Sequence, residues 1–316
     1  MNLDLSVVVA CYNCANTLER CLDSIPKNVG IEIILVDDNS KDQTISIIKH
    51  YIDCHKREKI ILISNEMTMG AGRTRNRGIE KATKKYITFL DSDDEFSENF
   101  LTSISPILDK DQDCIVFDAA LINQNNSLPL KMFYTNDLHE GILRQNDTLV
   151  YVRGATWGKI YKREIITAKK VLFGNIKRNE DLIFTKTAIA YCMHIYYVEE
   201  PLYRYNENQE SLMHNKSLLT EKNAIVAVSS IKETLISEGF TEEFNSIYFL
   251  EVVYSTTLTL IALGKTNKEC RNHYKTISKE YNRKDKYRHR YNRKYKIAYI
   301  LFALGLFDVI RSLLRK

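Results

Sequence analysis

Tyr86-Ile-Thr-Phe-Leu-Asp-Ser-Asp-Asp-Glu-Phe96 is the stretch of this 316-residue chain from which the fold can be argued. Its apolar run is typical of a buried strand, and it continues directly into an acid cluster. An extended backbone would place Asp91 and Asp93 on one side and Ser92 and Asp94 on the other. Two close carboxylates repel each other, and Mg²⁺ relieves this when it binds them together with substrate phosphates. The stretch therefore predicts a cation site at the carboxyl end of a parallel strand, with a solvated helix-capping turn as the alternative.

Short apolar runs alternate with amphipathic segments on both sides of this stretch. Such runs, separated by helices, predict right-handed βαβ units and a parallel sheet covered on both faces. The first 120 residues are therefore expected to form a nucleotide-binding α/β half. Strands are expected at 5–10, 31–36, 60–63, 87–90 and 114–118, and helices at 16–25, 44–52, 72–83 and 97–108.

Polar residues follow three of the expected strands. The first strand ends in Cys11-Tyr-Asn13, the second in Asp37-Asp38, and the fourth in the acid cluster. Tyr12 can stack on a base, and Asp38 can accept a hydrogen bond from an imide N–H such as that of uracil. An Asp before a helix is more often an N-cap, but three such endings at one sheet edge favour a nucleotide site.

An arginine-rich loop, Met69-Gly-Ala-Gly-Arg-Thr-Arg-Asn-Arg-Gly78, enters the third expected helix. Arginines at a helix N-terminus attract anions and suit a diphosphate; a solvated basic helix start is the alternative. The third Gly has the wrong offset for a GxGxxG loop, and the loop does not follow the first strand. A dinucleotide-binding fold is therefore disfavoured.

The chain has seven cysteines, and a secretory signal is not expected, because Met1 to Asp4 lead directly into the first expected strand. We therefore expect a cytoplasmic protein with reduced thiols. Cys11 and Cys14 are spaced like half a zinc site, but no second pair matches, so thiols in the core or in loops are favoured.

Four segments, in order, resemble the motifs of family 2 glycosyltransferases of the GT-A fold, the bacterial type that builds capsular and lipopolysaccharide glycans. They are Ser6-Val-Val-Val-Ala-Cys-Tyr-Asn13, Val36-Asp-Asp-Asn-Ser-Lys-Asp42, Arg75-Asn-Arg-Gly-Ile79 and Phe89-Leu-Asp-Ser-Asp-Asp94, the last matching the DxD signature. The resemblance covers about residues 5 to 205. It implies an α/β GT-A domain at residues 1–215, with a nucleotide-binding half at 1–120 and an acceptor half at 121–215.

The resemblance also implies roles on the donor side. Tyr12 and Asp38 would hold the nucleobase. Asp91 would contact the ribose or the water shell of a metal ion, and Asp93 would bind Mn²⁺ or Mg²⁺ bridging the diphosphate. The other donor-side candidates are Ala10, which stands where Pro or Thr is common, and Arg73, Arg75 and Ser92.

Two further segments resemble the acceptor half of the family. Ala155-Thr-Trp-Gly-Lys-Ile-Tyr161 contains the single Trp, Trp157, whose ring could pack on a sugar or anchor the core. Asn179-Glu-Asp-Leu-Ile-Phe184 opens a helix, where Asp181 would be a general base facing an acceptor hydroxyl or only an acid that stabilises the helix dipole. Lys159, Glu180 and Arg204 complete the acceptor-side candidates.

The C-terminal region, 216–316, is expected to be helical and has a different charge from the rest. Helices are expected at 218–237 and 244–263, and residues 265–296 then carry 13 Lys plus Arg against three acids, interleaved with five tyrosines. The apolar stretch 297–307 is too short to span a bilayer. Basic and aromatic residues beside it suit an anionic membrane surface, while docking on the body or a homodimer contact are the alternatives. No recognised nucleic-acid-binding fold accompanies the basic residues, so no nucleic-acid partner is expected.

These features together predict a metal-dependent, inverting glycosyltransferase. It would transfer a sugar from a nucleotide sugar, with a UDP-linked sugar expected, to a glycan or lipid-linked glycan in cell-surface polysaccharide synthesis. It would lie at the cytoplasmic face of the membrane. A nucleotidyltransferase is the alternative enzyme, distinguished by pyrophosphate release. A non-catalytic protein that binds nucleic acid or membrane is the alternative outside enzymes.

Overall fold

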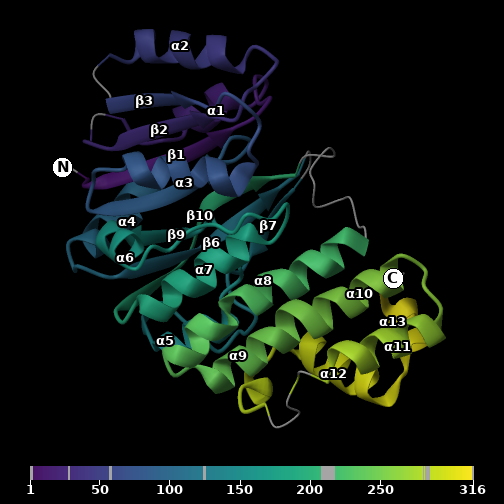
Figure 1. The fold of residues 1–316 in the computed structure, drawn as a ribbon. Helices are drawn as coiled ribbons and strands as arrows, with labels where there is room; N and C mark the ends of the chain where they lie inside the picture. The colour runs from purple at the N-terminus through teal and green to yellow at the C-terminus, as the bar shows by residue number, and fades with distance from the viewer. Residues whose placement is uncertain are drawn as a thin grey trace.

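A ten-stranded sheet runs through the α/β part of the protein (Figure 1). The computed structural model describes residues 3–27, 29–56, 59–123, 126–207, 218–279, 281 and 285–314. The strands are β1 (Leu5–Cys11), β2 (Glu32–Asp37), β3 (Lys59–Ser64), β4 (Tyr86–Asp91), β5 (Glu95–Phe96), β6 (Cys114–Ile122), β7 (Ser127–Leu130), β8 (Gly141–Leu143), β9 (Lys159–Lys162) and β10 (Ile195–Asn206). Their order along the sheet is β3-β2-β1-β4-β9-β6-β10-β5, with β7 beside β6 and β8 beside β10.

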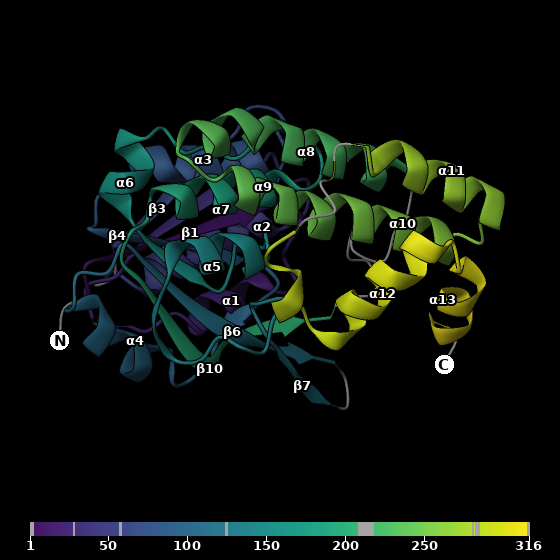
Figure 2. The same ribbon diagram turned by 90° about the horizontal axis from the view of Figure 1, so that it is seen from below.

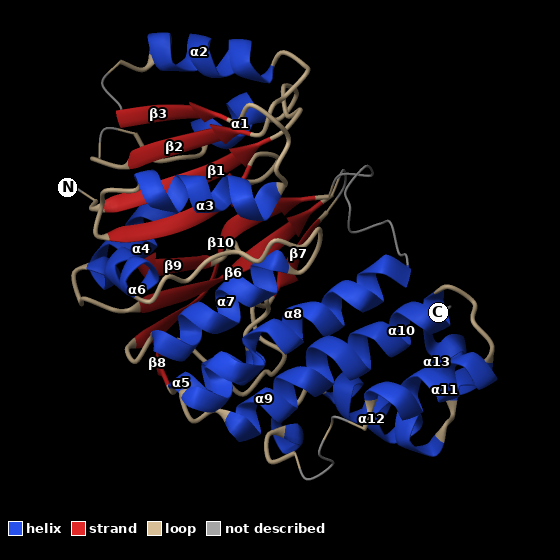
Figure 3. Ribbon diagram, viewed as in Figure 1, coloured by secondary structure: helices blue, strands red, loops and turns tan. Residues whose placement is uncertain are grey.

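Helices flank the sheet and form the rest of the chain (Figure 3). In the first part they are α1 (Leu18–Asp23), α2 (Thr44–Cys54), α3 (Ala71–Lys81), α4 (Phe100–Leu108), α5 (Gln145–Tyr151), α6 (Arg163–Ala168) and α7 (Glu180–Tyr191). The C-terminal region holds α8 (Leu218–Ser237), α9 (Thr241–Ile247), the π-helix η2 (Tyr248–Tyr254), α10 (Ser255–Ala262), α11 (Asn267–Ile277), the 3-10 turn η3 (Arg288–Arg290), α12 (Arg293–Leu304) and α13 (Phe307–Leu314).

The expected parallel βαβ arrangement is confirmed for the first four strands. β1 pairs in parallel with both β2 and β4, and β2 pairs in parallel with β3. Beyond β4 the sheet is mixed, because β9 lies antiparallel between β4 and β6. A strand that follows β4 by about seventy residues in the chain thus separates the predicted fourth and fifth strands.

The two faces of the sheet bury alternate residues of the same strands. Val8 and Phe89 belong to one buried cluster, whereas Val7 and Leu90 belong to the other. This alternation follows from the period of two along a strand. The first cluster lies under α3, α6 and α7, and the second under α1, α2 and α4. Figure 2 shows α3 and α6 on one side of the sheet and α4 on the other.

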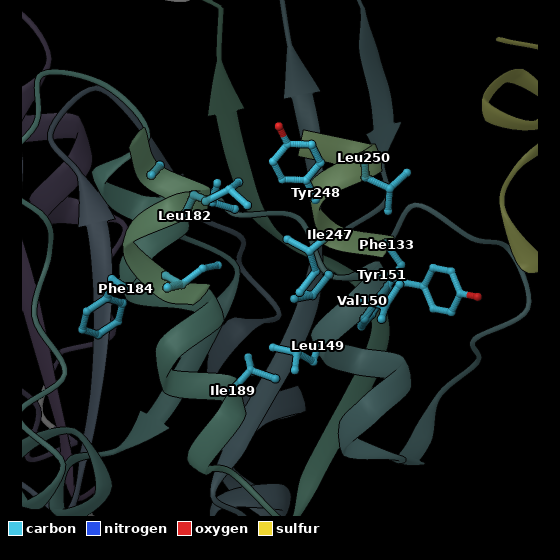
Figure 4. Packing of buried hydrophobic residues seen from close by; sticks show 14 of the residues in the cluster. Phe133, Leu149, Val150, Tyr151, Leu182, Phe184, Ile189, Ile247, Tyr248 and Leu250 are labelled. Carbon is cyan, nitrogen blue, oxygen red and sulfur yellow. The ribbon is translucent and has the colours of Figure 1, made fainter. Parts of the chain in front are cut away.

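The C-terminal helices share a continuous core with the α/β part. Side chains of α5, α7 and the α9–η2 segment point toward one another in Figure 4. Leu149, Ile189 and Ile247 have no exposed surface there, and burial of apolar side chains stabilises this contact. The predicted domain boundary at 215 falls within 208–217, outside the described residues.

The tyrosines of the basic stretch belong to this core and do not form an exposed surface. Asp285 accepts hydrogen bonds from Ser246 Oγ at 2.6 Å, Tyr291 Oη at 2.7 Å and Tyr281 Oη at 3.0 Å. The expectation that aromatic side chains and basic residues form one surface is therefore wrong. The five buried tyrosines are Tyr274, Tyr281, Tyr287, Tyr291 and Tyr295.

The apolar stretch that follows also packs in part on the body. Phe307 is fully buried, and Leu301 is partly buried against the core, whereas Ile300 and Leu304 stay exposed. Within the described ranges, no helix is both long enough and apolar enough to cross a bilayer.

Candidate active site

Three strand ends meet at one edge of the sheet, as predicted. Ala10 lies between Val36 of β2 and Asp91 of β4 in the strand register, and Cys11 lies opposite Asp37. Tyr12 follows at once and leaves 52% of its surface exposed. This edge therefore offers an aromatic ring beside two acids at the carboxyl ends of parallel strands.

The chain turns sharply after β4 instead of staying extended. We call this segment, residues 91–94, the acid turn. Asp94 N–H donates to the Asp91 carbonyl oxygen at 3.0 Å and closes the turn. The extended backbone on which the predicted alternation of side chains depends therefore ends at Asp91. Asp94 points inward, and its carboxylate accepts from Tyr203 Oη at 2.7 Å and from Asn206 N–H at 2.8 Å. Burial, followed by repulsion from Asp91, raises the pKa of Asp94 to about 8.

The turn itself is anchored through its backbone. The Ser92 carbonyl accepts from the Thr17 hydroxyl at 2.9 Å, and the Asp93 carbonyl accepts from Arg20 at 2.8 Å and from Asn206 Nδ2 at 3.0 Å. The Asp93 carboxylate receives no hydrogen bond from another residue in the described part of the chain. Burial and then the negative charge of Asp91 raise the pKa of Asp93. The backbone is thus held while one carboxylate stays available for a ligand.

Arg75 connects this turn to the start of α7. Its Nη2 lies 2.6 Å from Asp91 Oδ1, and its Nη1 lies 3.4 Å from Glu180 Oε1. The guanidinium carbon also lies 5.5 Å from the centre of the Phe173 ring. A planar fork with several donors can hold two carboxylates at once. Arg75 therefore brings β4, α3 and α7 together at one point.

Two glycines allow α3 to approach closely enough for this. A Cβ on Gly78 would lie 2.3 Å from Val8 Cγ1 of β1. A Cβ on Gly72 would lie 2.9 Å from Glu180 Cγ. Both distances are shorter than normal carbon–carbon contacts. Only glycine, which has no side chain, therefore fits at these two positions.

Asp181 lies beside this ion pair, in the first turn of α7. Its Oδ1 accepts from the Leu182 N–H at 2.8 Å. Burial, followed by the negative charge of Glu180, raises the pKa of Asp181 to about 7. A carboxylate that takes up and releases a proton near neutrality, next to the acid turn, can serve as a general base.

The other donor-side candidates differ in their exposure and in the hydrogen bonds that they already make. Arg73 is exposed on α3 and can meet an anion. Asp38 is buried, and its carboxylate already accepts from Asn65 Nδ2 at 2.7 Å and from the N–H groups of Met69 and Gly70, each at 2.8 Å. Burial opposes ionisation of Asp38, but these donors lower its pKa. A base N–H at Asp38 would compete with them, whereas buried Asp37 Oδ1 has no hydrogen-bond partner among the described residues.

The acceptor-side candidates lie on two sides of β10. Trp157 is half-buried and stacks on Tyr203 at 4.9 Å and on Tyr205 at 5.7 Å between ring centres. Lys159 is fully buried, and its amine donates to the Ala155 carbonyl at 2.8 Å. Contrary to the prediction, Lys159 therefore supports the Trp157 loop and does not face an acceptor. Arg204 lines a cleft with Arg20 and Glu95, on the side of β10 opposite Tyr203.

Sequence comparison identifies the family. The model of the glycosyl transferase family 2 matches residues 6–167, which is just over half of the chain and includes β1, the acid turn and β9. The chain belongs to glycosyl transferase family 2. This family 2 enzyme is a glycosyltransferase with the GT-A fold and a helical C-terminal region.

Relatives of this family 2 enzyme include EpsH of Bacillus subtilis (strain 168), which is 26% identical over 280 residues, 83% of this chain and 78% of EpsH. Poly(ribitol-phosphate) beta-N-acetylglucosaminyltransferase TarS of Staphylococcus aureus (strain Mu50) is 25% identical over 216 residues, 66% of this chain and 36% of TarS.

Two solved structures share the fold. TarS residues 1–349 in complex with UDP-GlcNAc give a TM-score of 0.72 at 17% identity, covering 99% of this chain and 90% of that one. The mannosyltransferase PcManGT of Pyrobaculum calidifontis, in complex with GDP-Man and Mn²⁺, gives 0.54 at 13% identity, covering 100% and 88%.

The family 2 glycosyltransferase has site contacts that no sequence pattern revealed. The Arg75–Glu180 contact joins residues 105 positions apart, and the Tyr203–Asp94 hydrogen bond joins residues 109 apart. Asn206, which holds the acid turn from β10, is not among the predicted site residues. Its place at the end of β10, directly after Tyr203-Arg-Tyr205, is the signal that the sequence offers.

The acid turn suits a divalent cation only together with a substrate. Within the described residues, no group of three or more His, Cys, Asp or Glu side chains is placed to hold a metal ion alone. Asp93 offers a carboxylate without a donor from another described residue, next to the like charge of Asp91. This donor set fits a hard cation that takes its remaining oxygen ligands from phosphates and water.

Proposed function

We propose that this enzyme transfers a hexosyl or N-acetylhexosaminyl group, with inversion, from a UDP-linked sugar to a hydroxyl of a surface glycan. The observation that carries the proposal is the Arg75 bridge from Asp91 to Glu180. Arg75 links the turn that carries Asp93, where a cation would hold the donor diphosphate, to the start of α7, where the raised pKa of Asp181 suits proton abstraction. The proposed donor site and the proposed base would thus lie at the same edge of the sheet.

The donor side is assigned from exposure and charge. Tyr12 presents an exposed ring for the base, and Arg73 is free to meet the diphosphate. The choice of UDP is supported by the fold neighbour TarS, whose structure contains UDP-GlcNAc. Asp91 would contact the ribose or the water around a cation, while Arg75 keeps its carboxylate in place.

Asp181 would act on the acceptor. Its carboxylate takes the proton of the acceptor hydroxyl as that oxygen forms a bond to the anomeric carbon of the sugar. The bond from that carbon to the diphosphate breaks at the same time, and the nucleoside diphosphate leaves with the electron pair. Attack from the side opposite the leaving group inverts the anomeric configuration.

Asp93, with Asp91 nearby, would hold Mn²⁺ or Mg²⁺ against the diphosphate. The cation would supply charge neutralisation at the leaving group. Mn²⁺ in the structure of PcManGT supports this assignment. The contacts of Thr17, Arg20 and Asn206 hold the backbone of the turn that carries Asp93.

The test is a panel of nucleotide sugars incubated with the full chain and Mn²⁺, with products separated by chromatography. We expect slow hydrolysis of a UDP-sugar to UDP and free sugar, abolished by EDTA. Proton NMR of the product with an added glycan acceptor reports the anomeric configuration. In a parallel assay, pyrophosphate release from a nucleoside triphosphate and a sugar 1-phosphate would instead identify a nucleotidyltransferase. Retention of configuration in the glycosyl product would rule out the role given to Asp181.

A further inference from the structure

One exposed face of α12, continued by Leu306 and by Val309 of α13, is apolar where a water-exposed helix face is normally polar. We define the apolar strip as Ile297, Ile300, Leu304, Leu306 and Val309, which are exposed by 38%, 55%, 65%, 44% and 44%. The opposite face of α12 buries Tyr295, Ala298 and Phe302 in the core. The helix is therefore apolar on both faces, and burial in the core accounts for only one of them.

Basic side chains stand at one end of this strip. Arg293 is exposed and lies one turn before Ile297 on the same face of α12, because four residues make about one helical turn. Lys296 is exposed and lies one turn before Ile300. The helix contains no acidic residue, and Asp308 on α13 is paired with Arg311 at 2.7 Å. The positive charge beside the strip is thus uncompensated within α12.

A small apolar pocket opens next to the strip. Its volume is about 180 Å³, and its walls include Tyr254 and Leu258 of the preceding helices and Leu301 and Ile310 from α12 and α13. Lys294, an exposed residue, also lines it. A pocket with apolar walls and an ammonium group beside it matches a molecule that has a hydrocarbon part joined to an anionic group.

We propose that this face binds the surface of an anionic lipid bilayer. Arg293, Lys294 and Lys296 would meet headgroup phosphates, and the apolar strip would enter the region between headgroups and acyl chains. A second copy of the chain would cover the apolar strip but would leave these basic side chains without an anionic partner. A nucleic acid would use the charges but leave the strip in water. Figure 2 shows α12 and α13 at the outside of the helical region, where a flat surface can reach them.

The test is co-sedimentation of the full chain with vesicles made of equal parts phosphatidylglycerol and phosphatidylcholine, at low and high salt. Vesicles of phosphatidylcholine alone are the lipid control. We expect binding to the anionic vesicles that weakens as salt rises. Two double variants test the surface, and each should weaken binding to the anionic vesicles about tenfold. One combines Ile300→Ser with Leu304→Ser, and the other combines Arg293→Ser with Lys296→Ser.

Matched control variants distinguish binding through this surface from non-specific hydrophobic or electrostatic binding elsewhere on the protein. Ile142→Ser with Met193→Ser removes two exposed apolar side chains, 77% and 73% exposed, from the α/β part. Lys49→Ser with Lys81→Ser removes two exposed charges from α2 and α3. Both control pairs should bind vesicles like the wild type, and all variants should melt like it, because every changed side chain is exposed.

Three outcomes would overturn the proposal. The wild type could fail to bind anionic vesicles, or the test pairs could bind no worse than the control pairs. Analytical ultracentrifugation without lipid could show an oligomer that Ile300→Ser with Leu304→Ser dissociates while vesicle binding is unchanged, which would assign the strip to a second copy. Tight binding of an RNA oligonucleotide, lost in the Arg293→Ser and Lys296→Ser pair without any vesicle binding, would assign the charges to nucleic acid.

Discussion

Two adjacent acids at the start of α7 have different surroundings. Glu180 faces the Arg75 guanidinium, whereas the hydrogen bond that the structure shows for the Asp181 carboxylate comes from Leu182 in its own helix. Burial is the first cause of the raised pKa of both acids. Arg75 holds Glu180 in an ion pair, so Asp181 is the acid better suited to exchange a proton with a ligand.

Asp181→Asn should reduce transfer by at least about 10²-fold and leave donor affinity nearly unchanged, because a general base acts mainly in the transition state. Asp181 holds its proton below its pKa of about 7, so wild-type kcat should rise with pH through that value and level off above it. The Asn variant should lose this rise. Steady-state rates against pH and calorimetric donor binding check both points. An equal loss of donor affinity would make Asp181 a structural helix cap, and Glu180 would become the base to test.

Asp93→Asn should abolish transfer and the metal dependence of donor binding, because an amide is a poor ligand for a hard cation. Titration of the variant with UDP in the presence and absence of Mn²⁺ measures this directly. Asp53→Asn, which changes an exposed acid on α2, is the control and should behave as wild type. Wild-type turnover of Asp93→Asn in Mn²⁺ would show that the cation is held elsewhere.

At the scale of elements, single side chains join segments that are distant in the chain. Arg75 holds α3 to both β4 and α7. Lys186 of α7 donates to the carbonyls of Leu149 at 2.9 Å and Val152 at 2.6 Å, at the end of α5. A cation at a helix C-terminus satisfies carbonyls that have no partner within the helix. These links set the position of α7, and therefore of Asp181.

Arg75→Gln should shift the pH midpoint of kcat upward, because the positive charge of Arg75 is among the causes that lower the pKa of Asp181. It should also lower kcat, since α7 loses its link to the acid turn. Arg73→Gln is the matched variant, with the same charge lost from the same helix. It should weaken donor binding but leave the midpoint in place. Equal midpoints in both variants would show that Arg75 does not act on Asp181.

Lys186→Met should lower the free energy of unfolding by about 2 kcal/mol, because buried carbonyls at the end of α5 lose a charged donor. Burial lowers the pKa of Lys186 from 10.5 to about 8. Between these pH values the unfolded chain binds more protons at this site, so the wild type gains stability as pH rises and the variant does not. Denaturant melts at pH 7 and 10 should therefore show a deficit that grows with pH. Lys81→Met, an exposed control, should change stability by less than about 0.5 kcal/mol.

The C-terminal region is built into the core of the enzyme. Phe249 of η2 stacks on Tyr291 with 5.7 Å between ring centres, and the Tyr151 hydroxyl donates to the Tyr287 carbonyl at 2.7 Å. Arg290 forms an ion pair with Asp147 of α5 at 2.7 Å. The last helices are therefore structural on their inner side, whatever their outer side binds.

Truncation after Thr266 should destabilise the enzyme severely, because it uncovers Phe249 and removes the buried side chains of Tyr274, Tyr291 and Phe302. We expect a melting temperature lower by at least about 10 °C, or insoluble protein. A chain that ends after Ser312 keeps all the described buried side chains and should melt like the full chain. A soluble truncated protein with the full melting temperature would show that the C-terminal helices are an independent appendage.

Much of the fold followed from local patterns in the chain. The first four strands lie within one or two residues of their predicted bounds, because each is a short run of mainly apolar residues. The helix at 218–237 also has its predicted bounds, and the donor-side residues Tyr12, Asp38 and Asp91 do gather at one edge. Parallel strands bring their carboxyl ends together whatever the details of packing.

The partners of charged and aromatic side chains could not be predicted in this way. The inward turn of Asp94, the burial of Lys159 and the Arg75 bridge each depend on a segment about seventy to more than a hundred residues away in the chain or on a turn that breaks a regular period. The tyrosines of the basic stretch are likewise core residues because η2 and α5 supply partners for them. A sequence pattern shows which face of an element is apolar. The free energy gained by packing the whole chain decides what that face meets.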